Sequence, residues 1–313
     1  NTTIGENVTI SGQLVDEMSN NISNADLVIY VDGVGFAAKT NANGGYSFNY
    51  TTTRIADDIV VNATFDGGDN YNSTSANTTF NVTKIATKTN VTIVNTTIGN
   101  VVIHVKVTDL SDYPVERGHV VVRNQTGQIV GEGELINGGV DITLNVTTVG
   151  NVKVNVTYQE NDVYYGSNAT NSSLSDDDPE INITNIDVVK QEASISIGLN
   201  PEVLIVGENV YIRGTVSVGD IFITSGQVNV TINGTNTTVN INSDGSYNLT
   251  YTAGVAGEYT VNATYLGNDS IDPVTSSNAI FTVNKIPTNT TITVINNTAG
   301  NVTIEVTVTN STG

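Results

Sequence analysis

Apolar and polar residues alternate with a period of two along most of this chain. The clearest runs are Asn7–Val15, Asp26–Gly33, Tyr46–Thr51, Ile59–Phe65 and Asn77–Thr83. Such alternation predicts β-strands that bury one face and expose the other. Pairs that suit tight hairpin turns stand between runs of this kind: Asp32-Gly33, Asn43-Gly44, Asn137-Gly138 and Asp244-Gly245. Because no stretch keeps a helical period with helix caps, the pattern predicts an all-β protein.

The same runs recur at a spacing of about 200 residues. "GENVTISG" from Gly5 returns as "GENVYIRG" from Gly207, and "VNATF" from Val61 returns as "VNATY" from Val261. "KIATKTNVTIVN" from Lys84 returns as "KIPTNTTITVIN" from Lys285. A repeat of this length exceeds one supersecondary unit. It predicts two alternating kinds of domain, which we call types A and B.

A shorter period marks the predicted domain ends. The segments "FNVTK" ending at Lys84, "IDVVK" ending at Lys190 and "FTVNK" ending at Lys285 share an apolar-x-Val-x-Lys pattern. We therefore predict a type A domain at 1–84, a type B domain at 85–190, a type A domain at 191–285 and the first strands of a type B domain at 286–313. Several short strands per domain, separated by turn residues, are typical of an immunoglobulin-like β-sandwich. The chain has no Cys and no Trp, so the core should consist of Val, Ile, Phe and Tyr.

The succession of "GENVTISG", "NGGYSFNYT", "VNATFDGGDNYNSTS" and "FNVTK" resembles the bacterial-type Ig-like repeats of large adhesin-like surface proteins from methanogenic archaea and some bacteria. The resemblance covers nearly the whole chain. It implies an extracellular, extended array of tandem Ig-like domains on a cell wall or in a fibre, with no catalytic residues to carry over. The second domain departs most from the repeat texture, in "SLSDDDPEIN" from Ser173 to Asn182.

Charge and composition limit the classes of partner that the chain could bind. The 313 residues include 11 Lys and Arg against 31 Asp and Glu, for a net charge of −20. So few basic side chains cannot neutralise a run of phosphates, which argues against nucleic acid as a partner. No apolar run approaches the roughly 20 residues of a membrane helix, so we expect no membrane insertion in this segment. The chain starts at Asn1 without Met, and we expect a mature or excised segment of something longer.

Asn-x-Ser/Thr, the acceptor sequence for N-glycosylation, occurs roughly two dozen times. The candidates are Asn7, Asn49, Asn62, Asn72, Asn81, Asn90, Asn145, Asn155, Asn248, Asn262 and Asn301. At any one site, two interpretations stay open: a glycan acceptor, or an exposed Asn and Thr of a strand or turn. For the chain as a whole, the density favours a secreted, at least partly glycosylated protein at the cell surface.

The stretch "FDGGDNYNSTS" from Phe65 to Ser75 gathers acidic and amide residues in the manner of a calcium loop. Calcium takes about six or more oxygen ligands, and Asp66, Asp69 and Asn70 supply too few alone. Counterparts of the stretch from Tyr158 and from Tyr265 precede the last strand of their domains. A structural turn is therefore favoured, with calcium as the weaker alternative.

The other candidate binding and catalytic sites have even less support in the sequence. Asp176, Asp177 and Asp178 form the densest acidic run, which we interpret as a solvated loop, with cation binding at a cleft between domains as the alternative. His104 and His119 have no Cys or second His at metal-ligand spacing. The chain has no phosphate-binding glycine loop and no nucleophile-elbow serine. We therefore predict no enzyme and no cofactor apart from the weak calcium candidates.

Lys84, Lys190 and Lys285 recur at the predicted joints although basic residues are scarce. The favoured interpretation is a lysine that lies along the strand end and pairs with carboxylates across the joint. An isopeptide cross-link to Asn or Asp is the alternative, for which no acidic catalyst is identified. Since few residues separate the domains, we expect an extended, semi-rigid array.

The two ends of the chain suggest a second hypothesis. The third domain opens with "EASISIGLN" from Glu192, and the first domain has no equivalent strand. The fourth domain supplies only two strands, which cannot bury a core alone. One explanation is that the chain is an excerpt from a longer array. The other is that residues 286–297 fill the gap in the first domain of a neighbour and so build a head-to-tail fibre.

Three functions follow from these observations. The leading hypothesis is a structural spacer or fibre-forming segment of an adhesin-like surface protein, with neighbouring copies or further repeats, the cell envelope or another cell surface as partners. A carbohydrate- or protein-binding module that uses loops at one end of a sandwich is the second. It is weakened because tyrosines occupy strand positions: Tyr46, Tyr50, Tyr247 and Tyr251. An enzyme is the third, and no residue pattern supports it.

Overall fold

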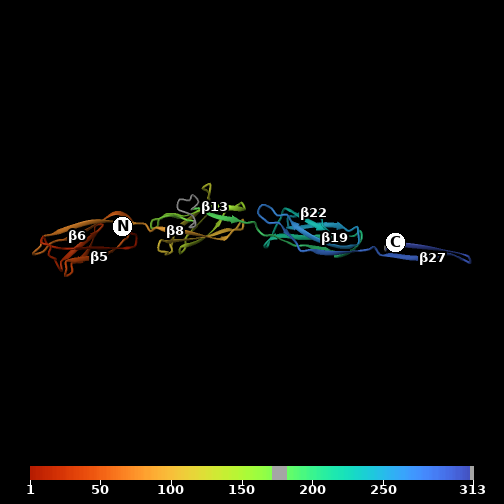
Figure 1. Ribbon diagram of the computed structural model, residues 1–313, viewed down its shortest axis with the longest axis horizontal. Coiled ribbons are helices and arrows are strands. Elements are labelled where there is room, and N and C mark those ends of the chain that lie inside the picture. Colours follow the sequence, from red (N-terminus) through yellow and green to blue (C-terminus); the bar gives the residue numbers. More distant parts are fainter. Residues whose placement is uncertain (171–181, 311–313) are drawn as a thin grey trace. The chain divides into compact units, whose positions relative to one another are not determined.

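The computed structural model describes residues 1–170 and 182–310, and every regular element in these ranges is a β-strand (Figure 1). By compactness the chain divides into two units. The first comprises Asn1–Asn95, Asn100–Asn145 and Lys153–Ile186, and the second comprises Thr96–Gly99, Val146–Val152 and Asp187–Gly313. This division does not separate residues 1–84 from the residues that follow, and the four predicted domains remain a prediction. No sheet nevertheless joins strands from two of the four predicted ranges in the described residues.

The first segment, residues 1–84, contains two antiparallel layers completed by one parallel edge strand. One sheet has the order β1-β7-β6-β3-β4, and β2 pairs with β5 in the other. Their bounds are β1 Thr2–Thr3, β2 Asn7–Gln13, β3 Asp26–Val31, β4 Val34–Lys39, β5 Gly45–Thr51, β6 Ala56–Phe65 and β7 Thr74–Thr83. Ile29, Val31 and Val61 of the larger sheet form the buried core, against which Ile10 and Phe48 of the smaller sheet pack.

The second segment, residues 85–190, has the same two-layer plan. One sheet has the order β11-β10-β13-β14 with β15 also beside β13, and the other has the order β12-β9-β8. Their bounds are β8 Thr87–Asn95, β9 Val101–Asp109, β10 His119–Asn124, β11 Ile129–Glu134, β12 Gly139–Leu144, β13 Gly150–Tyr158, β14 Ser167–Asn168 and β15 Thr184–Val188. Alternate residues of β9 are fully buried, as the period of two predicts.

The third segment, residues 191–285, repeats the first and adds a first strand. The larger sheet has the order β18-β26-β24-β21-β22 with β25 beside β24; in the smaller sheets β16, β17, β20 and β23 all pair with β19. Their bounds are β16 Ser194–Ile195, β17 Gly198–Asn200, β18 Val203–Ile205, β19 Asn209–Val218, β20 Ile221–Phe222, β21 Gln227–Ile232, β22 Thr235–Asn240, β23 Ser246–Thr252, β24 Gly257–Tyr265, β25 Val274–Thr275 and β26 Ala279–Asn284.

The last two strands form a separate ribbon, which Figure 1 shows at the C-terminal end of the chain. β27 Thr288–Thr298 pairs with β28 Asn301–Asn310 in antiparallel register. Ile292, Val294 and Ile304 are all more than half exposed. In the sequence-related hairpin of β8 and β9, by contrast, Val101, Ile103 and Val105 are fully buried. The ribbon therefore has an apolar face that nothing in the described chain covers.

The all-β, immunoglobulin-like sandwich predicted from the alternation is confirmed. The predicted turn pairs Asp32-Gly33 and Asn137-Gly138 have positive φ at both residues, as tight hairpin turns of the primed type require. At Asn43-Gly44 and Asp244-Gly245 only the glycine has positive φ. Two strands of the first segment were not predicted: the two-residue β1, and β4, whose sequence "VGFAAK" lacks clear alternation.

Candidate functional site

The first joint is a single residue, Lys84. Its neighbour Thr83 is hydrogen-bonded to the first segment, and its neighbour Ile85 is hydrogen-bonded to the second segment. Before it, the carbonyl of Thr83 accepts a hydrogen bond from the Ile4 amide at 3.0 Å. After it, the Ile85 amide donates to the Val163 carbonyl at 3.0 Å, and the Tyr165 amide donates to the Ile85 carbonyl at 2.9 Å. Ile85 thus lies as a parallel bridge beside Tyr164, in the loop between β13 and β14.

The second joint repeats this geometry around Lys190. Val189 donates its amide to the Thr96 carbonyl at 3.0 Å and accepts from the Ile98 amide at 2.8 Å. Gln191 donates its amide to the Ser270 carbonyl and accepts from the Asp272 amide, both at 2.9 Å. Two joints of different sequence therefore use the same main-chain contacts, which do not depend on the side chain after the lysine.

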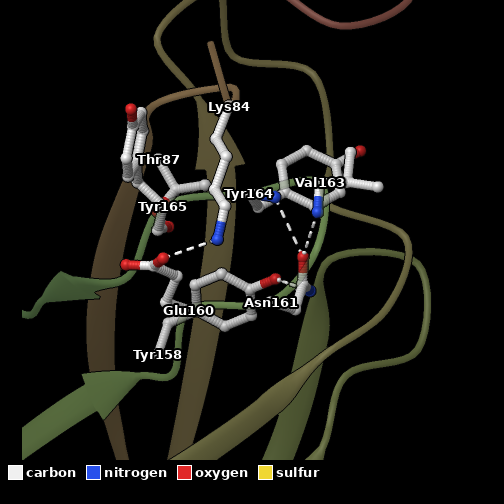
Figure 2. A network of polar contacts seen from close by, with 8 residues as sticks. All are labelled: Lys84, Thr87, Tyr158, Glu160, Asn161, Val163, Tyr164 and Tyr165. Carbon is white, nitrogen blue, oxygen red and sulfur yellow. Dashed lines mark hydrogen bonds and ion pairs between the residues drawn. The ribbon is translucent and has the colours of Figure 1, made fainter. Parts of the chain in front are cut away.

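Each joint lysine hydrogen-bonds to the same loop that binds the residue after it. We call this loop, between Tyr158 and Ser167 or between Tyr265 and Val274, the receiving loop. The Lys84 ammonium donates to Oε1 of Glu160 at 2.5 Å (Figure 2). The Lys190 ammonium instead donates to the backbone carbonyl of Asn268 at 2.6 Å. Pairing with a carboxylate, the interpretation favoured from the sequence, therefore describes Lys84 but not Lys190. Both contacts are partly exposed, so each contributes little to stability on its own.

An asparagine shapes each receiving loop. Figure 2 shows Asn161 between the Tyr158 ring and the backbone of the loop. Its Oδ1 accepts from the amides of Val163 and Tyr164, both at 2.9 Å, and its Nδ2 donates to the Tyr158 hydroxyl at 2.8 Å. Asn268 bonds Ser270, Ile271 and Tyr265 in the same way. The amide side chain fixes the turn and so presents the carbonyl that binds the joint.

The tyrosines beneath these loops are buried. Burial raises the pKa of Tyr158, an effect that the hydrogen bond from Asn161 partly offsets. Burial also raises the pKa of Tyr265 in the third segment. Both phenols are therefore neutral at physiological pH and serve as packing and hydrogen-bonding groups.

Sequence reasoning did not identify Asn161 and Asn268 as loop-forming residues. The shared spacing Tyr-x-x-Asn at Tyr158 and Tyr265 is the signal that would have found them. The first segment departs from this pattern, because Gly68 stands at the place of the asparagine. There, within the part of the chain that the structure describes, the turn is closed by backbone bonds between Gly68 and Tyr71 alone.

The calcium candidates are not gathered into a metal site. Asp66 and Asp69 are exposed in the loop between β6 and β7. The described residues contain no group of three or more His, Cys, Asp or Glu side chains that could hold a metal ion. Asp176, Asp177 and Asp178 lie outside the described residues. Calcium binding therefore stays a prediction that no geometry of the described chain supports.

The two histidines contact carboxylates on strand surfaces. His119 Nδ1 lies 2.8 Å from Glu134 and its Nε2 lies 3.3 Å from Glu132, while His104 Nδ1 lies 2.6 Å from Asp141. Burial favours neutral His119, but the hydrogen bonds to Glu134 and Glu132 outweigh it and raise the His119 pKa. These contacts account for both side chains without a ligand.

The predicted glycosylation sites fall into two groups. Seven are exposed: Asn7, Asn49, Asn72, Asn90, Asn145, Asn248 and Asn301. Four are only partly exposed: Asn62, Asn81, Asn155 and Asn262. Several exposed asparagines pair across strands with threonine, as where Thr51 donates to Asn7 at 2.7 Å and Thr9 to Asn49 at 2.9 Å. The abundance of Asn and Thr is thus partly explained by sheet pairing.

Residues 197–284 match the family of bacterial Ig-like domains, group 3. The match begins after β16 and ends at the last residue of β26, so the Lys190 joint lies outside it. A search of the curated proteins finds no match for the chain.

Several solved structures of adhesins are similar to the chain. A tetra-tandem repeat from the extending region of a large adhesion protein has 17% identity and a TM-score of 0.31, with 97% of this chain and 84% of that chain covered. A Ca²⁺-stabilised, ice-binding adhesin of an Antarctic bacterium has 14% identity and a TM-score of 0.32, with 93% and 72% covered. An Escherichia coli adhesin has 14% identity and a TM-score of 0.32, with 90% and 94% covered.

No helix in the described residues is long and apolar enough to cross a membrane.

Proposed function

We propose that this chain is a structural spacer segment of an extracellular, adhesin-like surface protein. One observation carries the proposal. Lys84 and Lys190 each form a one-residue linker: the residue before the lysine is hydrogen-bonded to the preceding segment, and the residue after it is hydrogen-bonded to the following segment. A one-residue linker with bonded flanks has few accessible backbone conformations, unlike a Gly- or Ser-rich linker. Such joints would transmit force and keep successive sandwiches in series. The bacterial Ig-like domain at 197–284 is consistent with this role.

The surface chemistry supports a role outside the cell. A net charge of −20 keeps copies apart at low salt. Glycans on the seven exposed candidate sites would shield sheet edges from pairing with other chains. Glycopeptide mapping of material from the native source would test this part. Modified Asn7, Asn49 or Asn248 is the expected result, and unmodified peptides at all seven sites would contradict it.

Small-angle X-ray scattering tests the spacer function directly. A Gly-Ser-Gly-Ser insertion between Thr83 and Lys84 should broaden the distribution of interatomic distances, because it separates the two bonded flanks. The same insertion after Gly127, in the turn between β10 and β11, is the matched control and should leave the distribution unchanged. If both variants match the original chain, the joint does not restrict the chain and the spacer function is wrong.

A binding module is the second candidate, and one observation favours it. Leu110, Tyr113 and Ile136 are 68%, 70% and 75% exposed on two loops of the second segment. The loops adjoin each other where Pro114 lies against Gly138. Exposed apolar side chains on neighbouring loops are typical of a contact site for protein or carbohydrate. Loss of cell or glycan binding in a Leu110→Ser, Tyr113→Ser variant would support this function, and unchanged binding would exclude these loops.

A further inference from the structure

Each of the three segments has one hairpin whose second strand forms an edge of a sheet: β3–β4, β10–β11 and β21–β22. Along such an edge strand, alternate residues bond the neighbouring strand, and the others point their amides and carbonyls outward. In β4 the outward residues are Gly35, Ala37 and Lys39, because Val31 and Val34 close the two-residue turn. None of the three has a backbone partner in the described residues. β4 therefore presents a free row of main-chain hydrogen-bonding groups.

The other two edge strands carry residues that hinder pairing with another chain. The outward residues of β11 include Glu132 and Glu134, whose carboxylates would repel those of an opposing copy. In β22 the outward residue Asn236 begins an Asn-x-Ser/Thr sequence, and Asn229 and Asn233 begin two more on the same hairpin. The β3–β4 hairpin has no such sequence, and β4 has no acidic residue. Of the three edges, β4 is thus the least protected against pairing.

The charges around β4 are paired within the first segment. Lys39 Nζ lies 3.4 Å from Asp26 at the open end of the hairpin. At its turn, Arg54 donates from Nε to the Asp32 carboxylate at 2.7 Å. Two bases thus offset two acids here, in a chain whose net charge is −20. Two copies can therefore approach along β4 with less repulsion than their net charge implies.

Apolar side chains line the inner side of the same edge. Val34 is 59% exposed. Phe36 is partly exposed and stacks on Phe48, with ring centroids 4.7 Å apart. At the two corresponding places β22 has Thr235 and Thr237. The first segment thus has an apolar rim where the third has a polar one, and an apolar rim gains more from being covered.

We propose that β4 pairs in antiparallel register with β4 of a second copy of this chain, about a two-fold axis at Ala37. This register opposes Gly35 to Lys39 and Ala37 to itself, so every outward group is used, in about six main-chain hydrogen bonds. Moving the register by two residues would pair fewer outward groups. On the inner side, Phe36 of each copy lies beside Ala38 of the other, and this small residue leaves room for the ring.

The outer side of the pairing is also complementary. A Cβ on Gly35 would lie 3.1 Å from the Tyr30 ring, so the ring lies next to the space above this glycine. Lys39 of the second copy is opposite Gly35 and meets no like charge. Its ammonium comes beside the Tyr30 ring, which suits a cation–π contact. The chemistry of β4 therefore matches that of its own copy turned by a half rotation.

The pairing is isologous, because the same strand serves both copies. It gives a closed dimer, and it joins two chains side by side whether or not either chain is a spacer. One short strand pair makes a small interface, so we expect a weak, reversible dimer. The remaining repulsion between two chains of net charge −20 should weaken the dimer at low salt, and screening should strengthen it.

Cysteine cross-linking tests the register, because the chain has no cysteine of its own. Ala37→Cys places two thiols opposite each other, with Cα atoms about 5.5 Å apart and within disulfide reach. Val34→Cys is the matched control, since it is exposed on the same strand but its two copies would lie about 20 Å apart. Both variants are made without glycans and keep the circular dichroism of the original chain if they fold.

Under mild oxidation at high salt, the Ala37→Cys chain should give about ten-fold more disulfide-linked dimer than the Val34→Cys chain, because pairing raises the effective concentration of its thiols. Equal yields would overturn the proposal.

A charge at the two-fold axis identifies the pairing edge without cysteine. Ala37→Asp sets two carboxylates opposite each other, so it should abolish the dimer that the original chain forms in analytical ultracentrifugation at high salt. Thr238→Asp puts the same charge at the corresponding place of β22 and should leave the dimer unchanged. If Thr238→Asp abolishes the dimer and Ala37→Asp does not, β22 is the pairing edge and the assignment to β4 is wrong. An original chain that stays monomeric up to about 1 mM would also overturn the proposal.

Discussion

Phe65 and Tyr265 hold the same place in the first and third segments but lie in different surroundings. Each ends the long strand before the receiving loop, β6 or β24. Tyr265 is fully buried beneath a first strand that its own segment supplies, and Phe65 lines an open groove. Two stretches of closely related sequence thus differ by one short strand. The comparison shows that this strand completes the core rather than merely extending the sheet.

The largest expected effect is a difference in lost stability between the cores of the third and first segments. Tyr265→Ala should destabilise the third segment by about 3–5 kcal/mol, because it leaves a cavity in a closed core. Phe65→Ala should cost the first segment clearly less, since solvent already reaches one side of the ring. Hydrogen exchange with mass spectrometry on the whole chain measures the opening free energy of each segment separately. Equal losses in the two segments would show that the groove does not weaken the first core.

The next largest effect on stability concerns Tyr247 and Tyr46, which hold the same place in the third and first segments. Tyr247→Phe should cost the third segment about 1 kcal/mol, because it removes the bond to the Ser196 carbonyl. Tyr46→Phe should cost the first segment almost nothing, since the described chain gives its hydroxyl no such partner. Local hydrogen exchange of the third and first segments measures the two losses. A matching loss in the Tyr46→Phe variant would mean that its hydroxyl has a hydrogen-bond partner after all.

Tyr247 also predicts an effect at alkaline pH. Burial raises the pKa of Tyr247 far above its ordinary value. The stability that this provides is fully present below the unfolded pKa of about 10 and is lost as pH rises toward the folded pKa. Hydrogen exchange at rising pH should show the third segment weakening above about pH 10. The Tyr247→Phe variant should lose that part of the pH dependence, and a variant that keeps it would exclude Tyr247 as the cause.

The last prediction concerns the receiving loops and includes the smallest expected effect, at Gly68. Asn268→Ala should cost about 1 kcal/mol, because the amides of Ser270 and Ile271 lose their shared acceptor. Gly68→Asn introduces the missing amide into the first segment, where an added Cβ meets no atom within 4 Å. It should slow exchange in the loop between β6 and β7 by a few-fold. Faster exchange in that variant would show that the loop holds a different turn.

Much of the fold could be predicted because sheet faces have a period of two. The alternation in "NVTISGQ" of β2 and "DLVIYV" of β3 places every second side chain inward, and the structure partly buries those positions in β2 and fully buries them in β3. The strand β4 was missed because "VGFAAK" lies at the sheet edge, where neither face is fully buried. Lysines at the joints were found from their recurrence, whereas the loop asparagines were not, since their role depends on backbone amides two and three residues away.

The sequence by itself determined that the chain is built from β-strands and that similar stretches recur at a spacing of about 200 residues. These properties follow from local alternation and from similarity between distant stretches of one chain. Only the tertiary structure decided that Ile85 and Gln191 lie beside loops 79 and 80 residues later, and that Leu14 and Phe65 line an open groove. Strand pairing between distant residues depends on main-chain hydrogen bonds, which are the same for every residue type except proline and so leave little trace in the sequence.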